Sequence, residues 1–330
     1  MSVYPPPSSS FPTLPLPQIR TKSVRHLRGI QKTVLFSAMI IVSAFIVSII
    51  AFYGYIAWML GNPAHDALRS NPKLAVGLSY EDVSFPSLTD ASHLNGWYIP
   101  SVVSSTKTVI FSHSYAGNRE EPWMPIYKIA AALHKKNFNV LMFDYAYANK
   151  ANHVSFTGGI KESKELLGAV RFVKQLGASE VIVWGFSMGA GTTLQAALQT
   201  KDINAMILDS TFIATPDTMF MNIKSKLNLP EYPSKMLIHY MFPYINGTGL
   251  TQIPYQKVLS TAYSVPIFFI HGKEDERSPY TIIQHLADNQ SANALSTIWI
   301  KPKAKHELVY DTDPKGYFKK TMEFIDKVSL

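Results

Sequence analysis

Residues 181–191 read VIVWGFSMGAG, and this stretch decides how the rest of the chain is interpreted. Four β-forming residues lead to Gly185, a serine follows at position 187, and small residues then open a helical pattern. The pentapeptide GFSMG matches G-x-S-x-G, a sharp turn that exposes a serine hydroxyl between a strand and a helix. Such a turn strains the serine backbone and leaves little room beside it, which explains Gly185 and Gly189. We expect Ser187 to be a nucleophile, and a merely tight strand-to-helix turn is the alternative.

Short β-rich runs alternate with helical patterns on both sides of this turn. The runs are nearly continuous in apolar residues, as in strands that are buried on both faces. The alternation predicts a mostly parallel sheet covered by helices. The expected strands are TVIFSH at 108–113, NVLMFDY at 139–145, EVIVWGF at 180–186, AMILDS at 205–210, PIFFIHG at 266–272 and STIWIK at 296–301.

Two segments depart from this alternation. Residues 80–101 contain two alternating runs joined by TDASHLNG, which predicts an antiparallel hairpin at the sheet edge. Residues 212–262 are rich in Met and aromatic residues without a strand pattern, so we expect an inserted helical cap there.

The N-terminal part of the chain predicts a membrane anchor. Residues 34–60 carry no charge, and about 20 apolar helical residues suffice to cross a bilayer. A cleaved signal peptide and a buried core helix are the alternatives, but the run is long, lacks a clear cleavage site and has no polar stripe. The predicted organisation is a disordered Pro/Ser-rich and basic segment at 1–32, a transmembrane helix at 33–60, a linker at 61–79 and a folded domain at 80–330.

Charge and composition limit the partners and the chemistry. Five basic residues precede the apolar run and few follow it closely, so the positive-inside rule predicts a cytoplasmic N-terminus and a folded domain on the opposite side. The net charge of +8 is spread along the chain, and we expect no nucleic-acid partner. The chain has no cysteine, which excludes disulfides and a thiol nucleophile.

A serine nucleophile needs a base, and the base needs a group that fixes its tautomer. Four histidines follow Ser187 in the chain. His306 lies in the loop after the last expected strand, where it can reach back over the sheet, so we predict that it is the base. The other three are expected to be structural or surface residues: His239, His271 and His285.

The acid and the oxyanion donors follow from the same chain order of serine, acid and histidine. Asp275, in a loop after a strand, is the preferred acid, and Asp209 at the end of AMILDS is the alternative acid. An oxyanion hole needs preorganised N–H donors. We expect these to be the backbone N–H of Met188 and that of Tyr115.

With these residues in place, residues 80–328 resemble the α/β-hydrolase superfamily. The resemblance is strongest to the serine aminopeptidase group and to membrane-anchored abhydrolase proteins. It is carried by SHSYAGNRE, FDYAYANK, GFSMG, HGKED and KAKHEL. It implies an α/β-hydrolase fold with a small cap, an oxyanion loop at Tyr115, and the triad of Ser187, Asp275 and His306.

The chain departs from the family pattern in two loops. Ser114 stands where the family usually has Gly. In the second loop, Ala146, Ala148 and Asn149 replace residues of the usual Arg-Gly-Tyr-Gly motif. The lost glycines leave the conformation of the oxyanion loop and the substrate entrance open.

The sequence thus predicts a membrane-anchored serine hydrolase that cleaves an ester, thioester or amide through an acyl-enzyme, without a metal or organic cofactor. The bilayer and a small-molecule or lipid-like acyl substrate are the expected partners. The alternative is a catalytically inactive scaffold that keeps the fold, because fold alone does not establish function.

Overall fold

A computed structural model describes residues 1–4, 22–89, 91–149, 152–224 and 226–329. The chain divides into two compact units, Met1–Phe52 and Tyr53–Leu330, each with its own internal contacts. Of the segment 1–32 for which disorder is predicted, residues 5–21 lie outside the described residues, whereas residues 22–32 are helical, so the prediction is wrong for that part.

The second unit is built on one sheet of eight strands in the order β1-β2-β4-β3-β5-β6-β7-β8. The pairs β1·β2 and β2·β4 are antiparallel and all the others are parallel. All six predicted central strands and the predicted edge hairpin are therefore confirmed. The bounds are β1 Glu81–Pro86, β2 His93–Ile99, β3 Lys107–Ser112, β4 Asn139–Phe143, β5 Glu180–Phe186, β6 Ala205–Asp209, β7 Ile267–Gly272 and β8 Thr297–Lys301.

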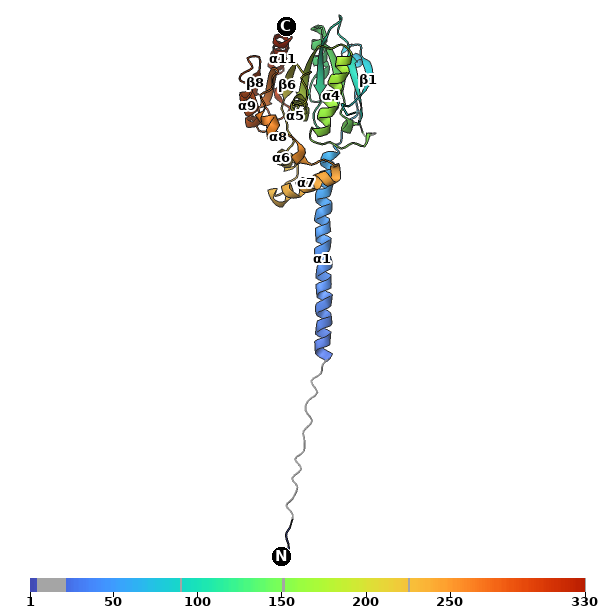
Figure 1. Ribbon diagram of the computed structural model, residues 1–330, viewed down its shortest axis with the longest axis vertical. Helices are drawn as coiled ribbons and strands as arrows, with labels where there is room; N and C mark the ends of the chain where they lie inside the picture. The colour runs from blue at the N-terminus through green and yellow to red at the C-terminus, as the bar shows by residue number, and fades with distance from the viewer. Residues whose placement is uncertain (5–21, 90, 150–151, 225, 330) are drawn as a thin grey trace. The chain divides into compact units, whose positions relative to one another are not determined.

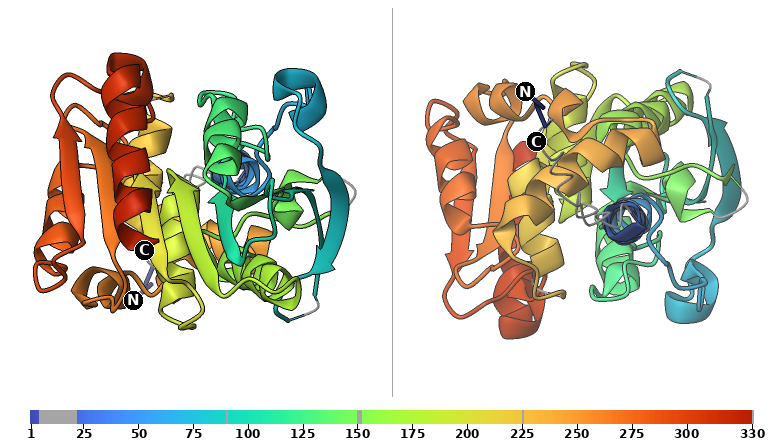
Figure 2. Two further views of the ribbon diagram at one scale, coloured as in Figure 1. Left: turned by 90° about the horizontal axis from the view of Figure 1, so that it is seen from above. Right: turned by 90° about the horizontal axis from the view of Figure 1, so that it is seen from below.

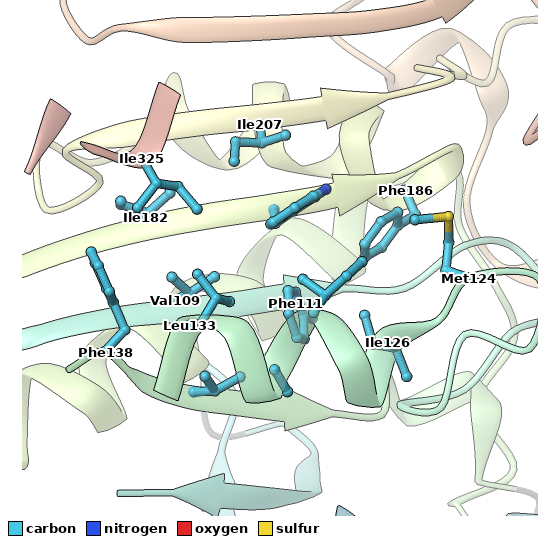
Figure 3. Close-up of a cluster of buried hydrophobic side chains, with 14 of the residues drawn as sticks. Val109, Phe111, Met124, Ile126, Leu133, Phe138, Ile182, Phe186, Ile207 and Ile325 are labelled. Carbon is cyan, nitrogen blue, oxygen red and sulfur yellow. The ribbon is translucent and has the colours of Figure 1, made fainter. Parts of the chain in front are cut away.

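Helices cover both faces of this sheet, as Figure 2 shows. On one face α3 (Ile126–Lys135) and α11 (Pro314–Val328) pack onto the central strands. Their buried side chains, including Leu133 and Ile325, meet Val109, Ile182 and Ile207 in one apolar cluster (Figure 3). On the other face α4 (Ile160–Gln175) and α5 (Met188–Ala197) lie side by side. Two short helices complete this part of the fold, α9 (Tyr280–Asp288) and α10 (Val309–Thr312).

The predicted cap is present between β6 and β7. It consists of α6 (Pro216–Lys224), α7 (Glu231–Asn246), a 3₁₀ turn at Leu250–Gln252 and α8 (Tyr255–Ser260). The longest of these, α7, lies beside the C-terminal end of α1 in Figure 1. The cap connection leaves from the carboxyl end of β6, the end of a parallel sheet at which ligands bind.

The helix α1 runs from Lys22 to Gly61, longer at its N-terminal end than the predicted span. Within it, Arg28–Gly61 is long and apolar enough to cross a membrane, with a mean hydropathy of 2.7 in its most apolar window. None of that window is buried in the protein. By length and composition this segment fits the predicted anchor.

The segment between this helix and the sheet needs a correction. The sequence predicts a linker at 61–79 and a folded domain from residue 80, whereas the compact unit begins at Tyr53. Asn71 caps a short helix, α2 (Pro72–Val76), by accepting a hydrogen bond from the N–H of Leu74. The carboxylate of Glu120 accepts hydrogen bonds from the backbone N–H groups of Arg69 and Ser70. The segment is therefore part of the domain, because contacts distant in sequence hold it.

Candidate active site

The turn at Ser187 has the geometry that the sequence motif predicts. Ser187 lies between β5 and α5 with φ 49° and ψ −112°, a strained backbone for a residue with a side chain. The turn is packed too tightly for larger neighbours. A Cβ on Gly189 would lie 2.0 Å from the carbonyl oxygen of Ser112, and one on Gly185 would lie 2.6 Å from the Cα of Ala190. The two glycines are thus needed for close approach, since neither has a positive φ.

Three side chains from separate loops form one hydrogen-bonded chain. The Oγ of Ser187 lies 2.7 Å from Nε2 of His306, and Nδ1 of His306 lies 2.7 Å from Oδ2 of Asp275. All three are almost completely buried. The structure therefore brings the predicted nucleophile, base and preferred acid together, with Nε2 of His306 toward the hydroxyl and Nδ1 toward the carboxylate, the arrangement that a general base requires.

Asp275 is ionised by its surroundings. Burial alone would raise the pKa of this carboxyl, but hydrogen bonds from His271 and His306 outweigh it and hold the pKa well below its usual value. Its other oxygen, Oδ1, accepts hydrogen bonds from the N–H groups of Arg277 and Ser278 at 2.9 and 2.8 Å. The carboxylate is thus held in one orientation from both ends.

The alternative acid, Asp209, has different partners. Its Oδ2 accepts a 2.6 Å hydrogen bond from the hydroxyl of Tyr317, and its Oδ1 accepts one from the hydroxyl of Ser210. Burial raises its pKa to about 6. The structure places Asp275, and not Asp209, against the imidazole of His306.

The role of His271 could not be deduced from the sequence. Its Nε2 lies 2.8 Å from the carbonyl oxygen of Ser278, which only accepts, so this nitrogen carries a proton. The same Nε2 lies 3.2 Å from Oδ2 of Asp275. His271 therefore donates a second hydrogen bond to the same carboxylate oxygen of Asp275 that faces His306. The only signal in the sequence was its position at the end of a strand, four residues before Asp275.

Ser114 is accommodated by a buried glutamate that the sequence analysis also missed. Oε2 of Glu121 accepts a hydrogen bond from the N–H of Ser114, and Oε1 lies 2.6 Å from its Oγ. Burial raises the pKa of Glu121 to about 8. The left-handed backbone in this loop falls at Ala116, with φ 61°, and not at Ser114. A glycine is therefore not required at position 114.

The second altered loop is also ordered without glycine. Residues 146–148 form a single 3₁₀ turn, and the N–H of Ala146 donates to the buried carboxylate of Glu165 at 2.9 Å. Neither Ala146 nor Ala148 has a positive φ. Nothing in the backbone of this turn calls for the glycines of the family pattern.

His113 connects the two loops. Its Nδ1 lies 2.8 Å from the carbonyl oxygen of Ser114, and its Nε2 accepts a hydrogen bond from the N–H of Tyr145. Burial lowers the pKa of His113 to about 4, so the ring is neutral and its tautomer is fixed by these two partners. His113 thereby fixes the backbone just before Tyr115.

The two expected oxyanion donors lie at neighbouring places in the fold. Met188 opens α5 and Tyr115 follows the end of β3, whose Ser112 hydroxyl donates to the carbonyl oxygen of Gly189 at 2.9 Å. Within the described part of the chain, neither the Met188 N–H nor the Tyr115 N–H donates to an acceptor. The side chain of Tyr115 is engaged, because its hydroxyl donates to the carbonyl oxygen of Leu60 at 2.8 Å.

Comparisons with known proteins agree with this architecture. A family model described as the alpha/beta hydrolase fold matches residues 107–237. Among solved structures, an esterase from Pyrococcus furiosus, Pf2001, superposes with a TM-score of 0.65 at 24% identity, covering 81% of this chain and 98% of that one. A thermophilic esterase from Thermogutta terrifontis gives a TM-score of 0.53 at 16% identity, covering 74% of this chain and 99% of the other.

The curated relatives match a smaller share of the chain than these structures do. The protein YfhR of Escherichia coli K12 is 27% identical over 212 residues, which cover 61% of this chain and 65% of YfhR. YqkD of Bacillus subtilis is 21% identical over 196 residues, which cover 58% of this chain and 63% of YqkD. The chain thus matches just under two thirds of the length of these relatives. The sheet order, the cap, the family model and the likeness to these structures together show that the chain has the α/β-hydrolase fold.

Proposed function

We propose that this protein is a serine hydrolase that cleaves an ester, thioester or amide through an acyl-enzyme. The observation that carries the proposal is the hydrogen-bonded chain from Ser187 Oγ through His306 to Asp275. The likeness to two esterases is consistent with it and adds no more than the fold. Esters are the first substrates to test.

The proposed reaction uses only groups of this chain and water. His306 Nε2 takes the proton from Ser187 as Oγ bonds to the substrate carbonyl carbon, and the negative charge of Asp275 stabilises the imidazolium. The proton then passes to the leaving group as the bond to it breaks. Water attacks the acyl-enzyme in the same manner and releases the acid. The N–H groups of Met188 and Tyr115 are the proposed donors to the oxyanion.

We also propose that α1 anchors the enzyme in a membrane with the catalytic unit on the side opposite the N-terminus. The apolar segment Arg28–Gly61 supports this proposal by length and composition. Basic residues at its N-terminal end, including Arg28 and Lys32, support the orientation. A lipid-like acyl substrate is part of this proposal, because an anchored enzyme meets such molecules at the bilayer.

A fluorophosphonate probe tests the nucleophile directly, since it labels only an activated serine. We expect the full-length protein in detergent micelles to be labelled, and labelling to disappear in Ser187→Ala and His306→Ala. His285→Ala is the matched control, because His285 lies in α9 and does not contact the triad. Absence of labelling in a folded wild-type protein would refute the proposal and favour a non-catalytic scaffold.

A further inference from the structure

The cap helix α7 has two sharply different faces. From residue 233 onward it is helical, and every fourth residue on one face is buried: Ser234, Ile238, Phe242 and Asn246. On the opposite face every fourth residue is exposed. Met236, Tyr240 and Tyr244 have exposed fractions of 39%, 60% and 90%. The spacing of four places each set on one stripe of the helix.

The buried face binds the C-terminal end of α1. The hydroxyls of Tyr53 and Ser234 lie 2.7 Å apart, and Nδ2 of Asn246 donates to the carbonyl oxygen of Ala57 at 2.8 Å. A Cβ on Gly61 would overlap the side chain of Asn246, so the two helices are in close contact there too. The cap helix is therefore fixed to the end of the apolar helix.

These contacts imply that α7 crosses α1 at a large angle. Ser234 and Asn246 are separated by about 18 Å along α7, because an α-helix rises about 1.5 Å per residue. Their partners Tyr53 and Ala57 are separated by only about 6 Å along α1 by the same rise. A helix that lay along α1 would match the two spacings. α7 therefore lies across the end of α1, residues 53–61, which belongs to the same compact unit as α7.

The exposed face of α7 has the chemistry of a membrane interface. No charged residue follows Lys235 in the helix, and Lys235 itself pairs with Asp217. Tyrosine has an apolar ring and a polar hydroxyl, and it is enriched at the level of the headgroups. At the end of α1, Tyr55 and Trp58 are also half or more exposed, and their rings stack at 6.0 Å.

We propose that the exposed face of α7, defined by Met236, Tyr240 and Tyr244, lies in the headgroup region of the bilayer that α1 spans. The inference rests on the proposed anchoring. We choose the bilayer as the partner of this exposed face because the chain is continuous: Tyr53, which contacts α7, lies in the same helix as the apolar span, with no linker between them. A helix in the membrane interface turns an uncharged face toward the bilayer, and the exposed face of α7 carries no charge.

This second membrane contact has a consequence for the site. The hydroxyl of Tyr115 is bound to Leu60, at the same end of α1 that holds α7. The cap and the proposed oxyanion loop are therefore both tied to one membrane-adjacent anchor point.

Single-cysteine labelling tests the position of α7, and the chain favours it because it has no native cysteine. Full-length Tyr240→Cys and Tyr244→Cys would be labelled with a nitrobenzoxadiazole maleimide and placed in phosphatidylcholine–phosphatidylglycerol vesicles. A phosphatidylcholine carrying a doxyl quencher near its headgroup reports contact with the bilayer. Leu295→Cys is the matched control, because Leu295 is exposed and lies near the amino end of β8. Ile41→Cys, in the apolar span, is the positive control.

We expect quenching at positions 240 and 244 to be several-fold stronger than at 295. Quenching at 41 with positions 240 and 244 no different from 295 would overturn the inference while leaving the anchor in place. Absence of quenching at 41 would refute the anchor, and the inference would fall with it. Fluorophosphonate labelling of the same proteins shows separately whether the proposed nucleophile is active, so a failure of the hydrolase proposal is distinguished from both.

Discussion

Replacing Asp275 by asparagine tests the proposed acid, and the structure predicts how the amide will orient. In the carboxylate, Oδ1 accepts from the N–H groups of Arg277 and Ser278, and Oδ2 faces Nδ1 of His306 and Nε2 of His271. Every one of these partners is a donor, so the NH₂ group of asparagine meets a donor in either orientation. Backbone N–H groups cannot change roles, whereas an imidazole can move its proton. We therefore expect the NH₂ group to face His306.

That orientation forces the wrong tautomer. Nδ1 of His306 becomes the acceptor, the proton moves to Nε2, and this nitrogen can no longer take the proton of Ser187. In a serine protease with a triad of this kind the same change lowers kcat by about 10⁴, which corresponds to about 5 kcal/mol of transition-state stabilisation. The assay is hydrolysis of a short p-nitrophenyl ester by the full-length protein in detergent micelles, with kcat and KM measured separately.

Asp209→Asn is the matched control, because it makes the same chemical change in a buried aspartate on the neighbouring strand. The partners of Asp209 are the hydroxyls of Tyr317 and Ser210, which can rotate to serve an amide. We expect kcat to fall by less than about tenfold and stability by about 1 kcal/mol. Equal losses in the two variants, or an Asp275→Asn enzyme within tenfold of wild type, would refute the assignment of the acid.

Three further substitutions test the loops around the site, each by chemical unfolding of the full-length protein in detergent. Tyr115→Phe removes the hydrogen bond to Leu60 and should lower the free energy of unfolding by about 1 kcal/mol; no change would show that this contact is not made. Gly189→Ala places a methyl group against the carbonyl oxygen of Ser112, so it should lower the free energy of unfolding by about 3 kcal/mol or more. It should also abolish fluorophosphonate labelling. The raised pKa of Glu121, about 8, means that the native state binds the extra proton below that pH. The free energy of unfolding should therefore fall as the pH rises from about 5 to about 8, by up to about 1.4 kcal/mol per pH unit. Glu121→Gln should flatten this slope.

The strands of this fold could be predicted because their signal is local. β3, β5 and β7 are continuous apolar runs that stop at a small or polar residue, and such runs belong to strands covered on both faces. The elbow at Ser187 could be predicted for the same reason, since its glycines lie within two residues of the serine. Chain order then limited the choice of base and acid to a few side chains. Their catalytic role stays a prediction until the variants above are measured.

The rest depends on contacts between residues distant in sequence. The fixed segment before α2 depends on Glu120, about fifty residues away, and no local pattern in 61–71 reveals that partner. In the sequence, the buried carboxyl group of Glu121 likewise looks like one of two adjacent surface charges. Only the folded chain shows that it accepts hydrogen bonds from Ser114 and sits beneath the proposed oxyanion loop.

The departure at Ser114 shows why a family pattern alone misjudges such a loop. A glycine supplies backbone freedom and close approach, and its loss suggests a distorted loop. Here the left-handed residue is Ala116, and the hydroxyl of Ser114 lies between Oε1 of Glu121 and the indole N–H of Trp123, at 2.6 and 3.3 Å. The serine, the glutamate and the tryptophan thus act as one polar unit that fixes the loop by side-chain hydrogen bonds. A glycine at position 114 would keep the backbone N–H that Oε2 of Glu121 accepts but would remove the hydroxyl that bonds to Oε1 of this buried carboxyl, so in this chain the family residue should be the destabilising one.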